Sequence, residues 1–121
     1  MDSRKILGAD GESAAVSFLR KRGVRILKRN FRCRMGEIDI IAREGNTYLV
    51  LEVKTRTGAC QGFPGEAVDH RKQFKICRTF DYYRMCRHLH DEIPVRFDVI
   101  EVSQSLECRW IKNAFSYIES F

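Results

Sequence analysis

Long hydrophobic runs are absent from this sequence of 121 residues. No stretch approaches the roughly 20 apolar residues that a membrane-spanning helix needs. The segment Met1–Asp10 also lacks the apolar core and the cleavage pattern of a signal peptide. We therefore expect a protein with no membrane partner.

Paired cysteines are absent as well. The chain has five cysteines, an odd number, and none of them forms a Cys-x-x-Cys motif. This excludes a regular disulfide framework and is typical of reduced thiols in the cytoplasm, where we expect the protein. Cys86, His88 and His90 are close enough in sequence to suggest zinc, but their spacing matches no standard finger. Exposed polar residues at a helix end are the favoured interpretation.

Internal repeats, low-complexity segments and linkers are also missing. The hydrophobic fraction of 44% and the charged fraction of 31% are ordinary for a globular protein. A chain of this length can bury one substantial core but not two. We therefore expect a single domain over residues 1–121.

Positive charge is in excess, with a net charge of +6 and a pI near 9.3. A basic small domain often binds nucleic acid through its phosphates, although solubility alone could explain the charge. The cations gather in two segments, one before residue 36 and one after residue 70, and the acidic residues do not neutralise them. This distribution favours nucleic acid, and we expect phosphate contacts from Arg32, Arg34, Arg56, Arg71 and Lys72.

Two apolar segments flank a short turn in the first half of the chain. Residues Gly36–Arg43 and Tyr48–Lys54 are rich in Ile, Val, Leu and Tyr, which suit strands. Gly45-Asn46 between them is typical of a two-residue hairpin turn, because both residue types tolerate positive φ. The pattern predicts a β-hairpin whose register is set by this turn.

In that register Asp39 lies opposite Glu52, and Glu37 lies opposite Lys54. Since side chains alternate between the faces of a strand, these four charged groups share one face. A slip of one residue would separate Asp39 from Glu52, so the prediction depends on a tight turn. The other face is predicted to be wholly apolar, with Ile38, Ile40, Ala42, Leu49, Leu51 and Val53.

The rest of the chain shows helical and extended patterns. A helix is predicted over Gly8–Arg22, with Asp10 as N-cap and Gly23 just beyond its end, followed by a basic edge strand over Val24–Arg34. A helix between two strands implies a crossover, so we expect an α/β fold with a central mixed β-sheet of about five strands flanked by helices. The other predicted elements are a loop or flap over Thr55–Gly65, a helix from Glu66 to about His88, strands over Val95–Val102 and Cys108–Ile111, and a helix over Asn113–Phe121.

Two polar residues fall on the apolar stripes of the predicted helices. Glu12 shares a stripe with Ala15 and Leu19, and Gln73 shares one with Ile76. The ordinary roles are a carboxylate favoured by the helix dipole and a core amide bound to backbone. The functional alternative is that both side chains point towards the hairpin carboxylates, with Gln73 orienting a water or phosphate.

Opposed carboxylates about 5 Å apart repel unless a proton or a cation lies between them. Asp39 and Glu52 form a hard oxygen site suited to Mg²⁺ or Mn²⁺, which can activate water and neutralise charge on a phosphate. Lys54 on the same face can stabilise the transition state or help to deprotonate the water. The alternative is a solvated sheet end with weak salt bridges, which the apolar opposite face makes less favourable.

Several short motifs recur in the order seen in a known family. They are Gly11-Glu12, Gly36-Glu37-Ile38-Asp39, Glu52-Val53-Lys54, Ala67-Val68-Asp69 with Lys72-Gln73, and Arg96-Phe97-Asp98. Over nearly the whole chain this pattern resembles the UPF0102 family of small bacterial proteins. That family resembles the PD-(D/E)XK nuclease superfamily and, in size and layout, the archaeal Holliday-junction resolvases. Ile38 stands where the motif name has proline, a departure shared by many members of the superfamily.

The resemblance implies a restriction-endonuclease-like domain and roles for five residues. Asp39 matches the first half-motif, and Glu52 with Lys54 matches the second. Glu12 matches a helix-borne glutamate that completes the metal shell, and Gln73 matches a glutamine on the helix after the motif. Cofactor and substrate are implied to be Mg²⁺ or Mn²⁺ and a nucleic acid, with DNA expected.

The leading hypothesis is a metal-dependent endonuclease that cleaves phosphodiester bonds in branched or otherwise structured DNA. Cleavage of two strands in the manner of a resolvase would require a homodimer. A non-catalytic nucleic-acid-binding accessory protein on the same fold is the alternative. A third hypothesis is a protein-interaction adaptor whose basic faces bind acidic partners. Folds host many functions, so the fold alone does not choose among these.

Overall fold

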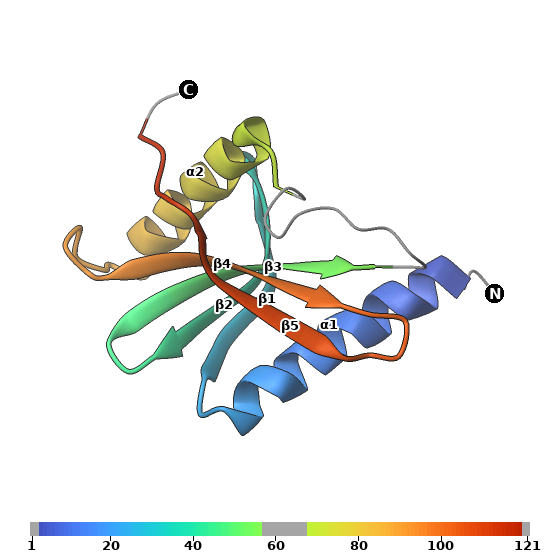
Figure 1. Cartoon of the computed structure of the whole chain (residues 1–121). Coiled ribbons are helices and arrows are strands. Elements are labelled where there is room, and N and C mark those ends of the chain that lie inside the picture. The colour runs from blue at the N-terminus through green and yellow to red at the C-terminus, as the bar shows by residue number, and fades with distance from the viewer. Residues whose placement is uncertain (1–2, 57–67, 120–121) are drawn as a thin grey trace.

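The computed structural model describes residues 3–56 and 68–119, with side chains from residue 10 onwards, and places two helices against one sheet (Figure 1). In chain order the elements are α1 (Ser3–Lys21), β1 (Arg25–Cys33), β2 (Gly36–Glu44), β3 (Thr47–Thr55), α2 (His70–Cys86), β4 (Val95–Val102) and β5 (Cys108–Phe115). No helix among these residues is long and apolar enough to cross a membrane.

The five strands form a mixed sheet in the order β1-β2-β3-β4-β5. The pairs β1–β2, β2–β3 and β4–β5 are antiparallel, whereas β3 and β4 are parallel because α2 connects them in a crossover. Basic β1 is an edge strand, as predicted. The predicted α/β architecture with a mixed sheet is confirmed, and it is consistent with a restriction-endonuclease-like fold.

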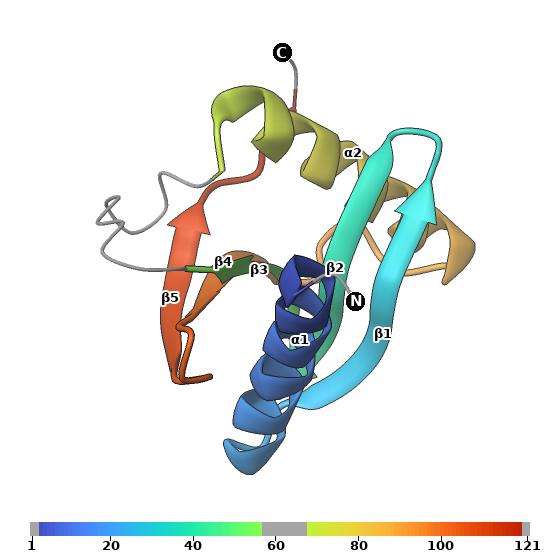
Figure 2. The same cartoon turned by 90° about the vertical axis from the view of Figure 1, so that its right-hand side faces the viewer.

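The helices cover opposite faces of the sheet, so that two hydrophobic clusters form (Figure 2). On the first face Ala15, Val16 and Leu19 of α1 pack against the inner residues of β2 and β3. On the second face Ile76 and Phe80 of α2 pack against the sheet. The helical spacing in the sequence therefore identified the packing stripe of each helix correctly.

The first helix begins earlier than predicted and ends where predicted. It runs from Ser3, so that Asp10 is an exposed residue within the helix and not its N-cap. At the other end Gly23 has a φ of 81°, and the N–H groups of Gly23 and Val24 donate to the carbonyls of Arg20 and Leu19 at 3.1 Å. This is a Schellman motif, for which glycine is favoured because it lacks a Cβ.

The hairpin turn is tight, and its register is the predicted one. Glu44 pairs with Thr47, and the pairing continues without a shift to Ile40 and Leu51. Of the two turn residues Gly45 and Asn46, only Gly45 takes a positive φ, of 60°. This is the arrangement of a hairpin turn with glycine at its first central position.

Beyond this register β2 and β3 separate. In place of a further ladder pair, the Val53 N–H donates to the Asp39 carboxylate, with 2.8 Å between the nitrogen and Oδ2. The alternation of β2 is broken here, since Ile40 packs on the α1 side and Ile38 packs on the α2 side. The prediction that Ile38 shares the apolar face with Ile40 is therefore wrong. On neighbouring β1, Asn30 takes a left-handed φ of 52° at the same level.

The second helix begins later than predicted. Asp69 is its N-cap, with an extended backbone and a carboxylate that accepts the Lys72 N–H at 2.8 Å. Asp69, which falls inside the helix predicted from Glu66, therefore lies just before it, because its side chain satisfies a free backbone donor. The predicted loop over Thr55–Gly65 falls mostly outside the described residues, since β3 continues to Thr55 and residues 57–67 are not described.

The C-terminal segment differs most from its prediction. β5 continues to Phe115, and residues 116–119 form no helix. Asn113 takes a left-handed φ of 55°, and its N–H donates to the buried carboxylate of Asp98 at 2.8 Å. This irregularity lets the strand resume pairing at Phe115 opposite Phe97. Pairing with the open edge of β4 thus replaces the helix that the apolar spacing predicted.

Candidate active site

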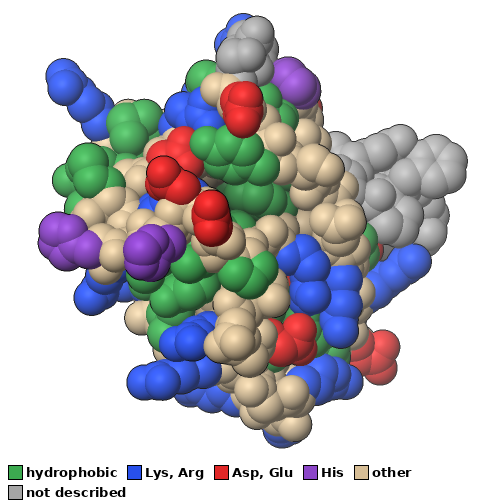
Figure 3. All heavy atoms as spheres, turned by 90° about the vertical axis from the view of Figure 1, so that its left-hand side faces the viewer, with side chains coloured by type: hydrophobic (Ala, Val, Ile, Leu, Met, Phe, Trp, Pro, Cys, Tyr) green, Lys and Arg blue, Asp and Glu red, His purple; other side chains and the backbone are tan. Residues whose placement is uncertain are grey.

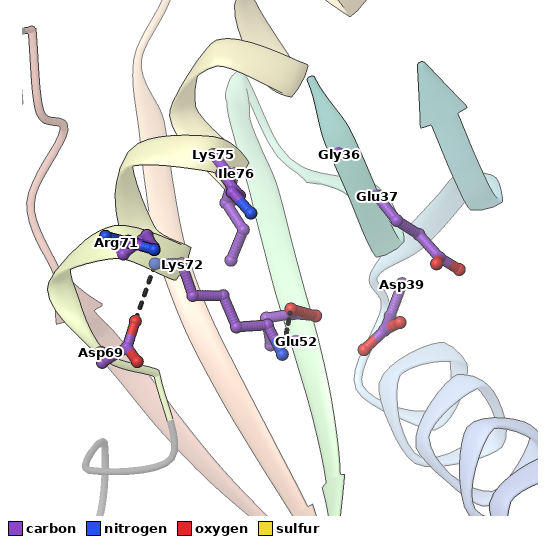
Figure 4. A pocket seen from close by; sticks show the side chains of 9 residues that line it. All are labelled: Gly36, Glu37, Asp39, Glu52, Asp69, Arg71, Lys72, Lys75 and Ile76. Carbon is purple, nitrogen blue, oxygen red and sulfur yellow. Dashed lines mark hydrogen bonds and ion pairs between the residues drawn. The ribbon is translucent and has the colours of Figure 1, made fainter. Parts of the chain in front are cut away.

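The point where β2 and β3 separate opens into a cavity of about 430 Å³. Figure 4 shows Asp39 on β2 at one side, the first turns of α2 at the other, and Glu52 on β3 between them. Carboxylates and cations meet on the walls of this cavity, which is lined by Gly36, Glu37, Asp39, Glu52, Asp69, Arg71, Lys72, Lys75 and Ile76.

Glu52 is the buried carboxyl group of the site, with 4% of its surface exposed. Burial and, after it, the nearby Asp39 raise its pKa to about 8 against the opposite effect of Lys72. The Lys72 ammonium contacts Glu52, with 3.3 Å between Nζ and Oε1. Glu52 therefore holds a proton near neutral pH unless another cation takes its place.

Asp39 reaches Glu52 from the neighbouring strand. One of its oxygens, Oδ2, accepts the Val53 N–H. That hydrogen bond fixes the carboxylate across the gap between the strands. The Asp39 carboxylate also interacts with the Glu52 carboxyl group, so the two acids lie where one cation could bind both.

Two amines flank this carboxyl pair. Burial lowers the pKa of Lys54, and the neighbouring Lys72 ammonium lowers it further, although Glu52 and Asp39 oppose the change. Burial also acts to lower the pKa of Lys72, but Lys54 and the two carboxylates outweigh it, so that the pKa of Lys72 is raised. Lys72 therefore keeps its proton, while Lys54 is the amine that loses a proton more readily.

Glu12 approaches Asp39 from α1, as the functional interpretation of its position predicts, but it does not line the cavity. It is half-buried. Burial raises its pKa, the charge of Asp39 raises it further, and Arg29 and Asn30 act in the opposite direction. Close packing of the helix on the sheet brings it there, because a Cβ added at Gly11 would lie only 2.5 Å from Thr55 Cγ2.

Two other predicted members of the cluster, Glu37 and Gln73, do not contact Glu52 or Lys54 as expected. The pairing of Glu37 with Lys54 is wrong, because Glu37 contacts Arg32 of β1 at 3.3 Å and Lys54 is opposite Glu101 of β4. Glu37 is exposed and forms the rim of the cavity. Gln73 donates its amide N–H to the Val68 carbonyl at 2.8 Å, which is the ordinary backbone role foreseen for it, and it does not line the cavity.

The predicted phosphate-binding cations are divided between the cavity and other surfaces. Arg71 and Lys72 line the cavity, and Arg32 lies at its rim through its contact with Glu37. Arg34 is exposed in the turn between β1 and β2. Arg56 lies away from the cavity and binds Glu101, with 3.0 Å between its terminal nitrogen and the carboxylate.

The contact of Lys72 with Glu52 was not predicted from the sequence. The sequence predicts only a phosphate contact for Lys72. Its distance of 20 positions from Glu52 gives no local pattern that would join the two residues. The neighbouring residues carried a partial signal. Asp69 three positions earlier fixes the start of α2, so Lys72 belongs to the first helical turn, which faces the gap between the strands.

The donor set fits a small divalent cation. Within residues 10–56 and 68–119, no three His, Cys, Asp or Glu side chains are gathered as a metal-binding group, which also gives no support to zinc at Cys86, His88 and His90. Asp39 and Glu52 provide two adjacent carboxylates in a cavity with room for water. Mg²⁺ typically binds in this way, through one or two carboxylates, waters and substrate phosphates.

A larger cavity of about 770 Å³ lies against the other end of α2 and has a different character. Figure 3 views the molecule from that side and shows acidic groups around hydrophobic ones. Its Asp81 is already bound, because the carboxylate accepts from Tyr117 at 2.8 Å and contacts Arg78 at 3.0 Å. We therefore take the smaller cavity as the candidate active site, because the buried Glu52, Asp39 and two amines come together there.

Comparison with known proteins identifies the family. The sequence profile of the uncharacterised protein family UPF0102 matches residues 11–102. The chain belongs to the UPF0102 family. It is 45% identical over 116 residues to a UPF0102 protein of Clostridium botulinum, covering 92% of this chain and 94% of the relative. A UPF0102 protein of Caldicellulosiruptor saccharolyticus is 45% identical over 118 residues, covering 93% and 99%.

The relatives are similar in length to this UPF0102 chain, and their names state no activity. A UPF0102 protein of Lachnoclostridium phytofermentans, 44% identical over 113 residues, covers 93% of this chain and 95% of its own. The family match spans Glu12, Asp39, Glu52, Lys54 and Lys72. The family resemblance predicted from the motifs is therefore confirmed, and function has to be argued from the site.

We predict that the stability of this UPF0102 protein depends on pH through Glu52. Its pKa is raised from 4.5 to about 8 in the folded state. The stabilisation is therefore fully present below the unfolded pKa and is lost as pH rises through about 8. Glu52→Gln, which mimics the protonated acid, should gain about 4 kcal/mol relative to the wild type between pH 5 and pH 9.

Urea denaturation of both proteins across this pH range measures the difference. Glu37→Gln is the matched control, because it makes the same change at an exposed carboxylate on the neighbouring strand β2, at the rim of the same cavity. A constant difference between Glu52→Gln and the wild type at every pH would contradict the prediction.

Proposed function

We propose that this protein is a metal-dependent endonuclease that hydrolyses phosphodiester bonds in DNA, with branched or otherwise structured DNA as its substrate. One observation carries the proposal. The buried carboxyl group of Glu52 and the carboxylate of Asp39 lie together beside two amines, on the wall of a cavity that is lined with cations.

The two carboxyl groups would hold Mg²⁺ or Mn²⁺, and Glu12, whose pKa is raised by the charge of Asp39, would complete the metal shell through a water. When bound, such a cation supplies positive charge against the phosphate and makes water more acidic. The buried position of Glu52 excludes competing solvent, and the Val53 N–H holds Asp39 in a fixed orientation. The protein thus presents a preorganised oxygen site.

Lys54 would take the proton of the attacking water. Its pKa is lowered by burial and by Lys72, so a neutral amine is available at lower pH than in an ordinary lysine. A base is most effective when its pKa lies near the working pH. Lys54 then carries a positive charge next to the phosphate at the moment when negative charge develops there, which stabilises the transition state.

The first turns of α2 would bind the substrate backbone. Arg71 and Lys75 line the cavity on this side, and the N-terminal end of a helix carries partial positive charge that favours phosphate. Phosphate contacts position a nucleic acid without reading its sequence. Recognition is therefore expected to depend on the shape of the DNA.

A panel of labelled substrates tests the proposal. A four-way junction, a flap, a duplex and a single strand, each in DNA and RNA, are incubated with Mg²⁺, with Mn²⁺ or with EDTA. We expect cleavage of the branched DNA in either metal and none in EDTA. Binding of these substrates without cleavage in any metal would overturn the proposal in favour of the non-catalytic accessory protein.

A further inference from the structure

Lys72 makes an ion pair that sets it apart from the other cations of the cavity. Its ammonium contacts a carboxyl group that is almost fully buried, since the side chain of Glu52 is 5% exposed and that of Lys72 is 41% exposed. Figure 4 shows the Lys72 side chain extending from the first turn of α2 to Glu52 on β3. The ammonium thus lies where a cation bound to Glu52 would also lie.

The backbone of Lys72 is anchored independently of its side chain, whose ammonium interacts with Glu52 and Lys54. The Lys72 N–H donates to the Asp69 carboxylate at 2.8 Å, and the Gln73 N–H donates to the Asp69 carbonyl at 2.9 Å. The ammonium, at the end of a flexible four-carbon stem, has no contact with a carboxylate besides Glu52 among the described ion pairs. It can therefore move without any change in α2.

We propose that Lys72 is a tethered counter-ion that binds Glu52 when no metal is present and leaves it when a divalent cation binds. When Glu52 is ionised, its buried carboxylate beside Asp39 is costly without a cation, and the ammonium provides one. The metal would then displace the ammonium towards the mouth of the cavity, beside Arg71, where it would bind a phosphate oxygen. This second step rests on the proposed function, whereas the displacement requires only a metal.

Two opposite effects of one substitution distinguish this role. Lys72→Met keeps most of the stem but removes the competing ammonium, so Mg²⁺ should bind about tenfold more tightly. The same substitution removes a phosphate contact, so a labelled branched DNA in Ca²⁺ should bind several-fold more weakly. A purely structural lysine would weaken both, and a purely phosphate-binding lysine would leave metal affinity unchanged.

Calorimetric titration with Mg²⁺ at about pH 9, above the pKa of Glu52 so that proton competition is small, measures the first effect. Lys75→Met is the matched control, because it removes the same charge from the same cavity wall without the contact to Glu52. Thermal melting of both variants shows that each is folded. We expect tighter binding for Lys72→Met than for Lys75→Met.

The outcomes separate this proposal from the proposed function. If the wild type binds Mg²⁺ through Asp39 and Lys72→Met binds it no more tightly than Lys75→Met, the counter-ion role is overturned and the endonuclease proposal stands. If neither the wild type nor Lys72→Met binds Mg²⁺, both are overturned. Tighter metal binding with unchanged DNA binding would retain the counter-ion and overturn the phosphate contact.

Discussion

Glu52→Gln should abolish cleavage of branched DNA, with a loss of about 10³-fold or more. The substitution keeps the size of the side chain but removes the negative charge from the buried oxygen site beside Asp39. Loss of the metal's charge stabilisation costs several kcal/mol, and each 1.4 kcal/mol corresponds to about tenfold in rate. DNA binding in Ca²⁺ should persist, because the cations of α2 remain in place.

The matched control is Glu37→Gln. Glu37 lines the same cavity, but it is exposed and contacts Arg32 at 3.3 Å, so its loss should change the rate less than about threefold.

Lys54→Met separates catalysis from metal binding, since this variant should lose cleavage while Mg²⁺ binding persists. Cleavage by Glu52→Gln at the wild-type rate would place the active site elsewhere or indicate a contaminating nuclease.

Asp98→Ala should unfold a large fraction of the protein under mild denaturing conditions, because Asp98 joins β4 to β5 in the core. Its carboxylate is fully buried. It accepts hydrogen bonds from Arg96 at 2.9 Å, from the Trp110 indole at 2.8 Å and from the Asn113 N–H at 2.8 Å. Removing it leaves the buried Trp110 and Asn113 donors without a partner and takes from Arg96 its closest carboxylate, at a cost of about 3–5 kcal/mol.

That loss is large beside a total stability of about 5–15 kcal/mol for a typical domain. Guanidinium denaturation monitored by Trp110 fluorescence measures it. Glu44→Gln is the control, because Glu44 also contacts Arg96, at 3.5 Å, but is more exposed. It should lose less than about 1 kcal/mol. A loss below that value for Asp98→Ala would show that the buried network contributes little.

Local rules predicted much of the candidate site correctly. The turn at Gly45 involves adjacent residues only, and it set the hairpin register from Glu44 to Ile40 without a shift. Because that register is correct, Asp39 and Glu52 lie near each other as predicted. Helical spacing likewise placed Glu12 on the side of α1 that approaches Asp39, because the apolar stripe that it shares packs on the sheet.

Other features depended on contacts between distant residues. The apolar residues after Asn113 match a helix as well as a strand, and the open edge of β4 with the buried Asp98 decides for the strand. The residues that follow are held by Arg78 of α2, which donates to the Ile118 carbonyl at 2.7 Å across 40 positions of sequence. No local pattern contains this information, because propensity is a weak prior that tertiary contacts override.

The sequence by itself determined the hairpin, its register and the identity of the paired carboxyl groups, because a two-residue turn and strand alternation are local properties. Only the tertiary structure decided that β2 leaves β3 at Asp39 and that Lys72 enters the gap from α2. It also assigned the four charges of the hairpin differently, keeping Lys54 beside Glu52 and moving Glu37 to Arg32. The physical reason is that the opening between the strands depends on how α2 and β1 pack around the hairpin, not on the hairpin alone.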